Sequence, residues 1–342
     1  MQDIARLANV SKTAVSLAFS GKPGISQATR NKIITIAQEA GYKPKISVPI
    51  NSRLAASHII RFVACTNSGI VSDQFNKQPF FMELIHEIEL ECRKRGCSLF
   101  FSAVPSDQLE DKITKLESEH KSDGIILLGT NLSKEQVRLV SEKQKNLIVL
   151  DTCFNTLDVN FIVMNNMMGS YQAAQHLIQL GHRIIGYVQS HDRMYNFESR
   201  KQGFLSALEE QGLSLAKAHT FSVSPTIVCS QADFKADISK LLPQLPTALF
   251  CECDYIAISV IKSLSELGIR IPEDVSVIGF DNIHESMVIS PELTTVHVEK
   301  KKIAELAVIN LLSMVEDPKH INMKTLLDTR LMIRNSCRSI VN

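Results

Sequence analysis

Residues 3–20 read DIARLANVSKTAVSLAFS, and this stretch predicts two short helices joined by a tight turn. The first helix covers about residues 3–8, where small apolar side chains recur on one face. The second covers about residues 12–19 and follows Ser11, a residue type that caps helix N-termini. Between them, Asn9 tolerates the left-handed backbone that a tight turn needs. The pattern is typical of a helix-turn-helix.

The residues that follow complete a small basic unit. A third helix is expected after Ser26, with an apolar stripe from Ile33 to Ala37 and an end at Gly41. Residues 1–53 carry eight basic and two acidic side chains, a net charge of +6, so the other 289 residues sum to about −5. A basic head on a mildly acidic body is expected when only the head touches a polyanion such as DNA, although a chance run of solvated lysines gives the same charge.

A helix-turn-helix places its second helix in the major groove of DNA, where short polar side chains reach the base edges. On the second helix these side chains are Ser11, Lys12, Thr13 and Ser16. Hydroxyl and guanidinium groups at helix and loop ends commonly hold phosphates. The residues expected in this role, or at the ends of the head, are Gln2, Ser20, Ser26, Thr29, Arg30 and Tyr42. The alternative is a helical hairpin that packs on a partner protein.

A linker follows the head. Residues 44–58 read PKISVPINSRLAASH, in which two prolines resist helix as far as Pro49, while residues 50–57 suit a short helix. We therefore predict a DNA-binding domain at 1–44, a hinge at 45–60 and a larger core at 61–342.

The core alternates short apolar runs with amphipathic helices, as parallel α/β units do. Helices are expected at 81–95, 169–180 and 255–267. The expected strands are 62–65, 99–103, 124–128, 147–150, 161–164, 184–188, 248–251 and 275–280. A doubly wound fold of this length is expected to split into two lobes around a cleft. The predicted division gives lobe 1 residues 61–160 and 291–318, and lobe 2 residues 161–290 and 319–342.

The composition limits the function classes. No apolar run is long enough to span a bilayer and no signal pattern opens the chain, so a cytoplasmic protein is expected. Eight cysteines without Cys-x-x-Cys spacing predict reduced thiols, and neither a metal site nor a cofactor is expected. The sequence lacks G-x-G-x-x-G, P-loop, H-E-x-x-H and G-x-S-x-G strings, so no catalytic residues are predicted.

Beyond these patterns, residues 3–44 (DIARLANVSKTAVSLAFSGKPGISQATRNKIITIAQEAGYKP) resemble the DNA-binding head of the lactose-repressor (LacI/GalR) family nearly position by position. The likeness continues in HLIQLGHRIIGYV (176–188), Arg200-x-x-Gly203-Phe204, Asp254-x-x-Ala257, IPEDVSVIGFDN (271–282) and PELTTV (291–296). It covers almost the whole chain in order, which makes it far more specific than a helix-turn-helix alone.

This resemblance implies a homodimeric transcriptional regulator, with repression as the family's default and corepression as an alternative. It implies a periplasmic-binding-protein-like core and a pseudo-palindromic double-stranded operator. It also implies that a hinge leucine, best matched by Leu54, wedges into the minor groove. The chain departs from the family at Lys45 and Pro49 near the hinge and at Leu17 in the recognition helix. The first helix also starts almost at Met1 without the usual cap, which leaves room for residues upstream.

The cleft of such a core binds a small-molecule effector at the carboxyl ends of its strands. The resemblance assigns Arg200 and Asp254 to effector binding, and it places Asp281 near the same strand ends at the edge of the cleft. Asp151 follows a predicted strand in the same way. For Asp151 and Asp281 the alternative is a helix cap, and Phe80 and Phe81 either stack on the effector or fill the core. A sugar or sugar derivative suits the set, although Cys253 stands where sugar-binding members have Asn.

Two rival hypotheses share the α/β core. A solute-binding protein would need export, whereas this chain has a basic three-helix head in place of a signal peptide. A cytosolic sugar-processing enzyme is supported by the core alone. The sequence therefore predicts an allosteric transcription factor in which an effector between two lobes controls DNA binding.

Overall fold

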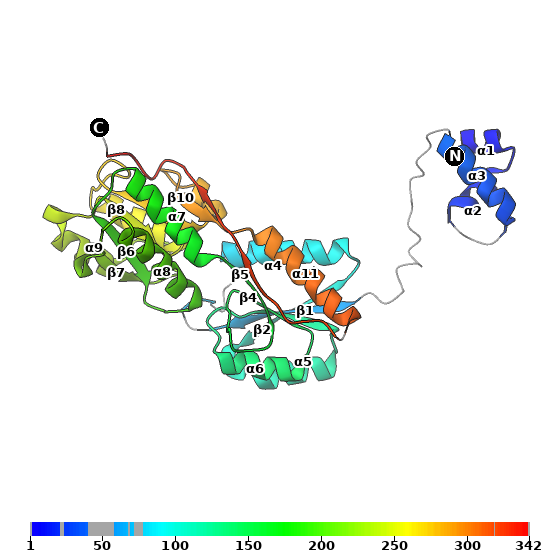
Figure 1. Cartoon of the computed structure of the whole chain (residues 1–342), viewed down its shortest axis with the longest axis horizontal. Helices are drawn as coiled ribbons and strands as arrows, with labels where there is room; N and C mark the ends of the chain where they lie inside the picture. The colour runs from blue at the N-terminus through cyan, green and yellow to red at the C-terminus, as the bar shows by residue number, and fades with distance from the viewer. Residues whose placement is uncertain are drawn as a thin grey trace. The chain divides into compact units, whose positions relative to one another are not determined.

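The structure is a computed structural model that describes residues 2–20, 24–39, 58–67, 69–71, 78–317 and 319–340. The chain divides into two compact units, Met1–Ser57 and His58–Asn342. Figure 1 draws both units.

The N-terminal unit contains α1 (Gln2–Ala8), α2 (Lys12–Ser20) and α3 (Gln27–Glu39). The three helices enclose a small core that includes Ile4, Val15 and Ile33. Asn9 has φ +53° in the turn between α1 and α2, and the Ser11 hydroxyl accepts a hydrogen bond from the Ala14 N–H at 3.1 Å. The predicted helix-turn-helix is therefore confirmed, including the left-handed turn residue and the helix cap.

The described part of the larger unit forms two six-stranded sheets. The sheet of lobe 1 has the order β11-β5-β4-β3-β1-β2 and is parallel throughout. Its strands are β1 (Ile59–Thr66), β2 (Ser98–Pro105), β3 (Gly124–Leu128), β4 (Leu147–Leu150), β5 (Asn160–Met164) and β11 (Lys324–Leu327). The near-continuous apolar runs of β1, β3, β4 and β5 fit this arrangement, because both faces of a parallel sheet are covered by helices.

Lobe 2 repeats the plan in the order β12-β10-β9-β8-β6-β7, with only the β10–β12 pair antiparallel. Its strands are β6 (Ile185–Ser190), β7 (Thr220–Val223), β8 (Ala248–Cys251), β9 (Ser276–Asp281), β10 (Thr294–His297) and β12 (Arg330–Met332). The predicted fold, two doubly wound α/β lobes behind a three-helix head, is confirmed. All eight predicted strands are present, whereas β7, β10, β11 and β12 were not predicted.

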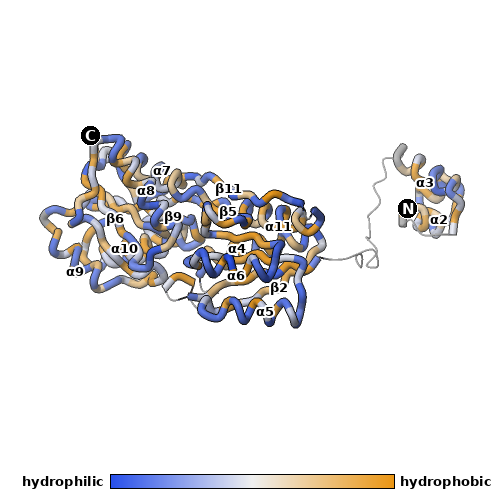
Figure 2. The backbone as a smooth tube through the Cα atoms, turned by 60° about the horizontal axis from the view of Figure 1, so that its bottom comes forward, coloured by the Kyte–Doolittle hydropathy of each residue, from blue (hydrophilic) through white to orange (hydrophobic). Residues whose placement is uncertain are grey.

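Helices cover both sheets. In lobe 1 they are α4 (Pro79–Lys94), α5 (Leu109–Glu119), α6 (Lys134–Lys143) and α11 (Lys300–Glu316). In lobe 2 they are α7 (Asn166–Gln179), α8 (Tyr195–Glu209), α9 (Ala232–Lys240) and α10 (Asp254–Glu266). Helices α4 and α11 pack side by side, as do α7 and α8. The mixed colours of α5 and α6 in Figure 2 fit helices that bury only one face, through Ile113 and Val140 among others.

The predicted lobe boundaries differ from the strand pairing. β5 and β11 belong to lobe 1 although residues 161–164 and 324–327 were assigned to lobe 2, and β10 belongs to lobe 2 although residues 294–297 were assigned to lobe 1. The physical reason is that the chain crosses between the lobes three times, after β5, β10 and β11, and the late strands β11 and β12 each join the edge of a sheet built from earlier strands.

Candidate functional site

The side chains predicted to contact bases lie on the surface of α2. Ser11, Lys12, Thr13 and Ser16 are exposed, while Val15 is buried between them. This is the arrangement that a recognition helix requires, with one face holding the helix in the unit and the other left for a ligand. The Ser11 hydroxyl also caps α2, so its side chain has a structural role as well.

The residues predicted to hold phosphates have local roles at helix ends. The Ser26 hydroxyl accepts the Thr29 N–H at 3.1 Å and caps α3. The Arg30 guanidinium donates to the carbonyls of Leu17 and Ala18 at 2.8 and 3.0 Å, which ties α3 to the end of α2. Gln2 is exposed and Ser20 is the last residue of α2. Tyr42 and Leu54, with the expected hinge helix, lie outside the described residues.

A small cavity of about 40 Å³ lies between the two lobes of the larger unit. Phe80, Phe81, Asp151, Arg200 and Asp281, all predicted from the sequence, line it. The other lining residues are Ile70, Gln78, Met194, Asn196, Phe197, Pro225, Thr226, Cys253 and Tyr255. Ligand pockets usually enclose roughly 300–1,000 Å³, so the lobes are closed on one another here. A ligand the size of a sugar would have to move them apart.

Arg200 is the centre of the polar network in this cavity. Its guanidinium donates to Asn166 Oδ1 at 2.9 Å, to the Glu252 carbonyl at 2.5 Å and to Asp281 Oδ1 at 3.1 Å. The ring of Phe280 lies 3.7 Å below it, so one face of the guanidinium is stacked. Arg200 and Asp281 are both buried. Burial raises the pKa of the Asp281 carboxyl, and the charge of Arg200 opposes that rise.

Asp151 joins the lobes. Its carboxylate accepts hydrogen bonds from the Thr130 hydroxyl of lobe 1 and from Asn196 Nδ2 of lobe 2, the latter at 2.6 Å. Burial raises the pKa of Asp151 to about 6, although both hydrogen bonds lower it. Asp151 is therefore an inter-lobe contact as well as a cavity residue, a role that neither of its predicted alternatives described. A second inter-lobe bond runs from the Phe80 N–H to the Tyr255 hydroxyl at 3.1 Å.

Asp254 differs from the other predicted effector residues because it is not among those lining the cavity. Its carboxylate is fully buried and accepts from the Thr295 hydroxyl at 2.5 Å and from the Ile283 N–H at 3.0 Å. Burial and the nearby charge of Asp281 raise the pKa of Asp254 to about 8. In this closed arrangement it holds the segment after β9, and Cys253 beside it is the residue that reaches the cavity.

The two aromatic candidates lie where the hydrophobic core meets the cavity. Phe80 and Phe81 are buried in the main hydrophobic core, and they also line the cavity. Their rings meet edge to face at 5.6 Å. Filling the core and facing the cavity are therefore not exclusive at the start of α4.

Sequence reasoning missed an ion pair beside the cavity. The fully buried Glu252 accepts from Arg193 Nη1 at 2.8 Å, from the Tyr187 hydroxyl at 2.8 Å and from the Ser190 N–H at 2.7 Å. Burial raises the pKa of Glu252, and Arg193 opposes that rise. A charged residue directly after the apolar strand β8 was the available signal. The backbone carbonyl of Glu252 in turn accepts a hydrogen bond from Arg200 Nη1.

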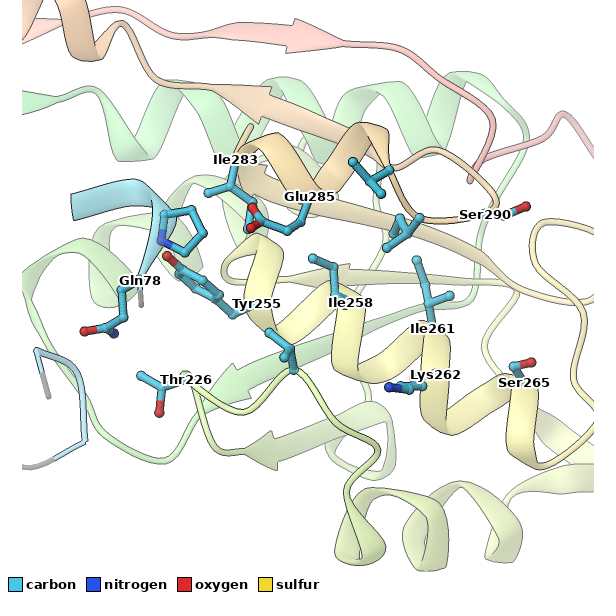
Figure 3. Close-up of a pocket in the computed structure, with 14 residues that line it drawn as sticks. Gln78, Thr226, Tyr255, Ile258, Ile261, Lys262, Ser265, Ile283, Glu285 and Ser290 are labelled. Carbon is cyan, nitrogen blue, oxygen red and sulfur yellow. The ribbon is translucent and has the colours of Figure 1, made fainter. Parts of the chain in front are cut away.

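A second and larger hollow of about 720 Å³ runs along the outer side of α10 (Figure 3). Tyr255, Ile258, Ile261 and Ser265 present one face of α10 to it, and Val288 also lines it. Val288 is 69% exposed, and its neighbour Met287 is 48% exposed. We call this hollow the α10 groove.

A helix-turn-helix head combined with a two-lobed core defines the class of DNA-binding regulators that respond to a ligand. Residues 1–45 match the lacI family of bacterial regulatory proteins, and residues 174–337 match the periplasmic binding protein-like domain. The chain belongs to the lacI family, and it is a DNA-binding transcriptional regulator rather than an enzyme.

Two relatives and one solved structure illustrate the similarity. The HTH-type transcriptional repressor PurR of Aliivibrio salmonicida is 30% identical, over 94% of this chain and 93% of its own length. The ribose operon repressor of Haemophilus influenzae is 31% identical, over 99% of both chains. The structure of the transcriptional regulator CelR in complex with cellobiose has a TM-score of 0.71 at 22% identity and covers 97% of this chain and 98% of CelR. Among the described residues, no helix is long and apolar enough to cross a membrane.

Proposed function

We propose that this chain is a cytoplasmic homodimeric repressor that binds pseudo-palindromic operator DNA and is controlled by a small molecule held between the lobes of its core. The observation that carries the proposal is the coexistence of an exposed polar face on α2 with a buried, polar cavity between two closed lobes. The relatives named PurR and ribose operon repressor are both repressors, which supports repression as the response.

Base contacts are assigned to Lys12, Thr13 and Ser16, which lie exposed on α2, and Ser11 contributes at the start of the same helix. The net charge of +6 over residues 1–53 supplies the attraction to phosphate that both specific and nonspecific binding need. Gln2, Ser20, Ser26, Thr29, Arg30, Tyr42 and Leu54 are the remaining proposed DNA contacts.

Operator binding is tested by selecting duplexes from a random library with the purified full chain. Affinity for the selected duplex and for a scrambled one is then measured by fluorescence anisotropy across a salt series. We expect a two-fold symmetric consensus and a steep fall of affinity with salt for both duplexes. Absence of binding to any duplex at low salt would contradict the proposal.

The effector is proposed to be a sugar or sugar derivative. The cavity supplies carboxylate acceptors in Asp151 and Asp281, a guanidinium donor in Arg200, and aromatic faces in Phe80 and Phe81. Hydroxyl groups that donate to carboxylates and a ring that stacks on aromatic side chains match that set. The relative that controls a ribose operon supports the same class. Asp254 remains a proposed effector residue only for a state in which the lobes have separated.

A thermal-shift screen tests this assignment with neutral sugars, sugar phosphates and purine bases. A compound that binds the native core raises its apparent stability with the logarithm of one plus the ratio of its concentration to its dissociation constant. We expect a neutral sugar to shift the unfolding transition of the wild type but not that of Asp281→Asn. A purine that shifts both equally would refute the sugar assignment and leave DNA binding untouched.

The α10 groove is proposed as the face on which a second copy of the chain packs. Val288 and Met287 are exposed beside the groove, while Ile258 and Ile261 line it, so a partner would remove a substantial apolar area from water. Gln78 and Pro79 from lobe 1 line the same groove. Its shape therefore depends on the angle between the lobes, and a dimer formed there would respond to effector binding.

A further inference from the structure

Helix α11 begins with three consecutive lysines and has no acidic residue in its first turn. Positive charge is unfavourable at a helix N-terminus, where the backbone N–H groups already present a positive end. The side chain of Lys300 is in addition only 8% exposed. A buried charge persists only where partners compensate for its lost hydration. The partners of Lys300 therefore show what this lysine does.

The ammonium group of Lys300 meets groups from both lobes. In lobe 1 it pairs with Glu83 Oε2 at 2.8 Å and lies 5.3 Å from the centre of the Phe80 ring, both on α4. In lobe 2 it donates to the carbonyl oxygens of Asp281 and Asn282 at 3.2 and 3.4 Å. One ammonium group thus bridges a helix of lobe 1 and the turn at the end of β9 in lobe 2, which Asp281 and Asn282 form.

That turn has an unusual backbone. Asp281 has φ +116° and Asn282 has φ +51°, both in the left-handed region that residues other than glycine seldom occupy. Such a conformation persists only where surrounding contacts hold it. Asn282 Oδ1 accepts Arg334 Nη2 at 2.6 Å, and its amide Nδ2 lies 2.9 Å from His297 Nδ1, on the strand that leads into α11. Lys300 holds the two carbonyls of the turn, and the other contacts hold the Asn282 side chain.

The same residues form the cavity wall. Phe80 and Asp281 both line the cavity, one from each lobe, and Lys300 contacts both although it is not itself a lining residue. We propose that Lys300 is a positioning residue, which ties α4 to the Asp281–Asn282 turn and thereby sets the angle at which the lobes close around the effector. The inference deepens the proposed effector control and rests on it.

The test measures the distance between the lobes in the full chain, without DNA or effector. p-Acetylphenylalanine replaces the exposed Lys112 of lobe 1 and Gln211 of lobe 2, and an aminooxy spin label on each leaves the cysteines unmodified. Pulsed dipolar spectroscopy then gives the distance distribution. Lys300→Met removes the charge and keeps the chain length, while Glu83→Gln keeps the lysine and removes its ion pair.

The matched control is Lys302→Met. Lys302 lies on the same first turn of α11 and pairs with Glu305 at 3.0 Å, but its side chain is 51% exposed and its pair lies within one helix. Exposed pairs of this kind contribute little to stability. The control therefore removes an equal charge from the same helix end without touching lobe 2.

We expect a second distance population in Lys300→Met and, more weakly, in Glu83→Gln. Its ratio to the closed population should rise about tenfold over wild type, the change that corresponds to 1.4 kcal/mol. Lys302→Met should match wild type, and Lys300→Arg should restore part of the closed population. Lower stability of Lys300→Met in urea with an unchanged distance distribution would overturn the proposal, because it would show a purely structural role.

If Lys300→Met does not fold, Glu83→Gln decides by the same criterion. Because neither DNA nor a ligand is present, failure of operator binding or of the sugar assignment leaves this measurement unaffected.

Discussion

Replacing Arg200 with methionine tests whether the cavity between the lobes is held by a buried ion pair. The substitution keeps an unbranched side chain over the Phe280 ring but removes every donor. Asp281 loses a guanidinium at 3.1 Å, and the Glu252 carbonyl loses a donor at 2.5 Å. Since Asp281 is only 6% exposed, water cannot replace the lost partner without opening the lobes.

The expected cost follows from that burial. Removing one member of a buried ion pair leaves an uncompensated charge and typically costs about 3–5 kcal/mol. Asp281 can limit this cost by taking up a proton. Burial already raises the pKa of Asp281 and Arg200 lowers it, so the pKa rises further in the variant. A carboxyl whose folded-state pKa exceeds its unfolded value loses stability as pH rises, so the penalty should be larger at pH 8 than at pH 5.

The assay is urea unfolding of the core, followed by far-UV circular dichroism, for wild type, Arg200→Met, Asp281→Asn and the double variant. Replacing both charges removes the unpaired carboxylate, so the double variant should be more stable than Arg200→Met by at least about 1 kcal/mol. An Arg200→Met core within about 1 kcal/mol of wild type at pH 7 would refute the buried pair. A penalty that is independent of pH would refute the role of Asp281.

Other predictions concern the lobe contact, the head and the groove. Burial raises the pKa of Asp151 to about 6, so the contribution of Asp151 to the free energy of unfolding should fall as pH rises from about 4 to 7. In urea unfolding, the stability of wild type relative to Asp151→Asn should fall by about 2–3 kcal/mol over that window. A stability difference that does not change with pH would contradict the raised pKa. Lys12→Ala should weaken binding to the selected duplex about 10- to 100-fold by anisotropy and change the selected bases. Lys32→Ala removes an equal charge from α3 and should lower the affinity for every duplex by about a few-fold. Equal effects of the two substitutions would show that Lys12 does not recognise bases. Val288→Glu should raise the dimer dissociation constant at least about tenfold in sedimentation equilibrium. Ile321 is an exposed apolar residue that does not line the groove, so Ile321→Glu should leave that constant unchanged. A dimer unchanged by Val288→Glu would place the interface elsewhere.

The elements of this fold could be predicted because each has a local cause. The helices of the head follow from the cap at Ser11 and the turn at Asn9, and the strands of the core follow from apolar runs of four or five residues. The four strands that escaped prediction are of three or four residues each, and three lie next to a crossing between the lobes. A short edge strand such as β11 has no apolar run, since two of its four residues are exposed.

The lobe to which each strand belongs could not be predicted, because strand pairing depends on which sheet has a free edge. The same limit applies to the site. Asp254 and Asp281 both border strands of lobe 2, yet only Asp281 lines the cavity, since the turn after β9 carries positive φ values that aim its carboxylate at Arg200. The Asp254 carboxylate instead accepts a hydrogen bond from the Thr295 hydroxyl inside the same lobe. A motif match identifies both residues but does not show which of them lines the cavity.

Asp281 connects the cavity between the lobes to the angle between the lobes through two different atoms. Its carboxylate binds Arg200 inside the cavity, while its carbonyl oxygen accepts Lys300, which also pairs with Glu83 of lobe 1. A ligand that competes for the carboxylate must shift a turn whose backbone is already held in a left-handed conformation, and Lys300 transmits that shift to α4. Coupling of this kind is reciprocal, so any second ligand whose binding favours one lobe angle must change effector affinity by the same factor as the effector changes the affinity of that ligand. A variant at Lys300 should therefore reduce the coupling between effector and operator while leaving both ligands able to bind.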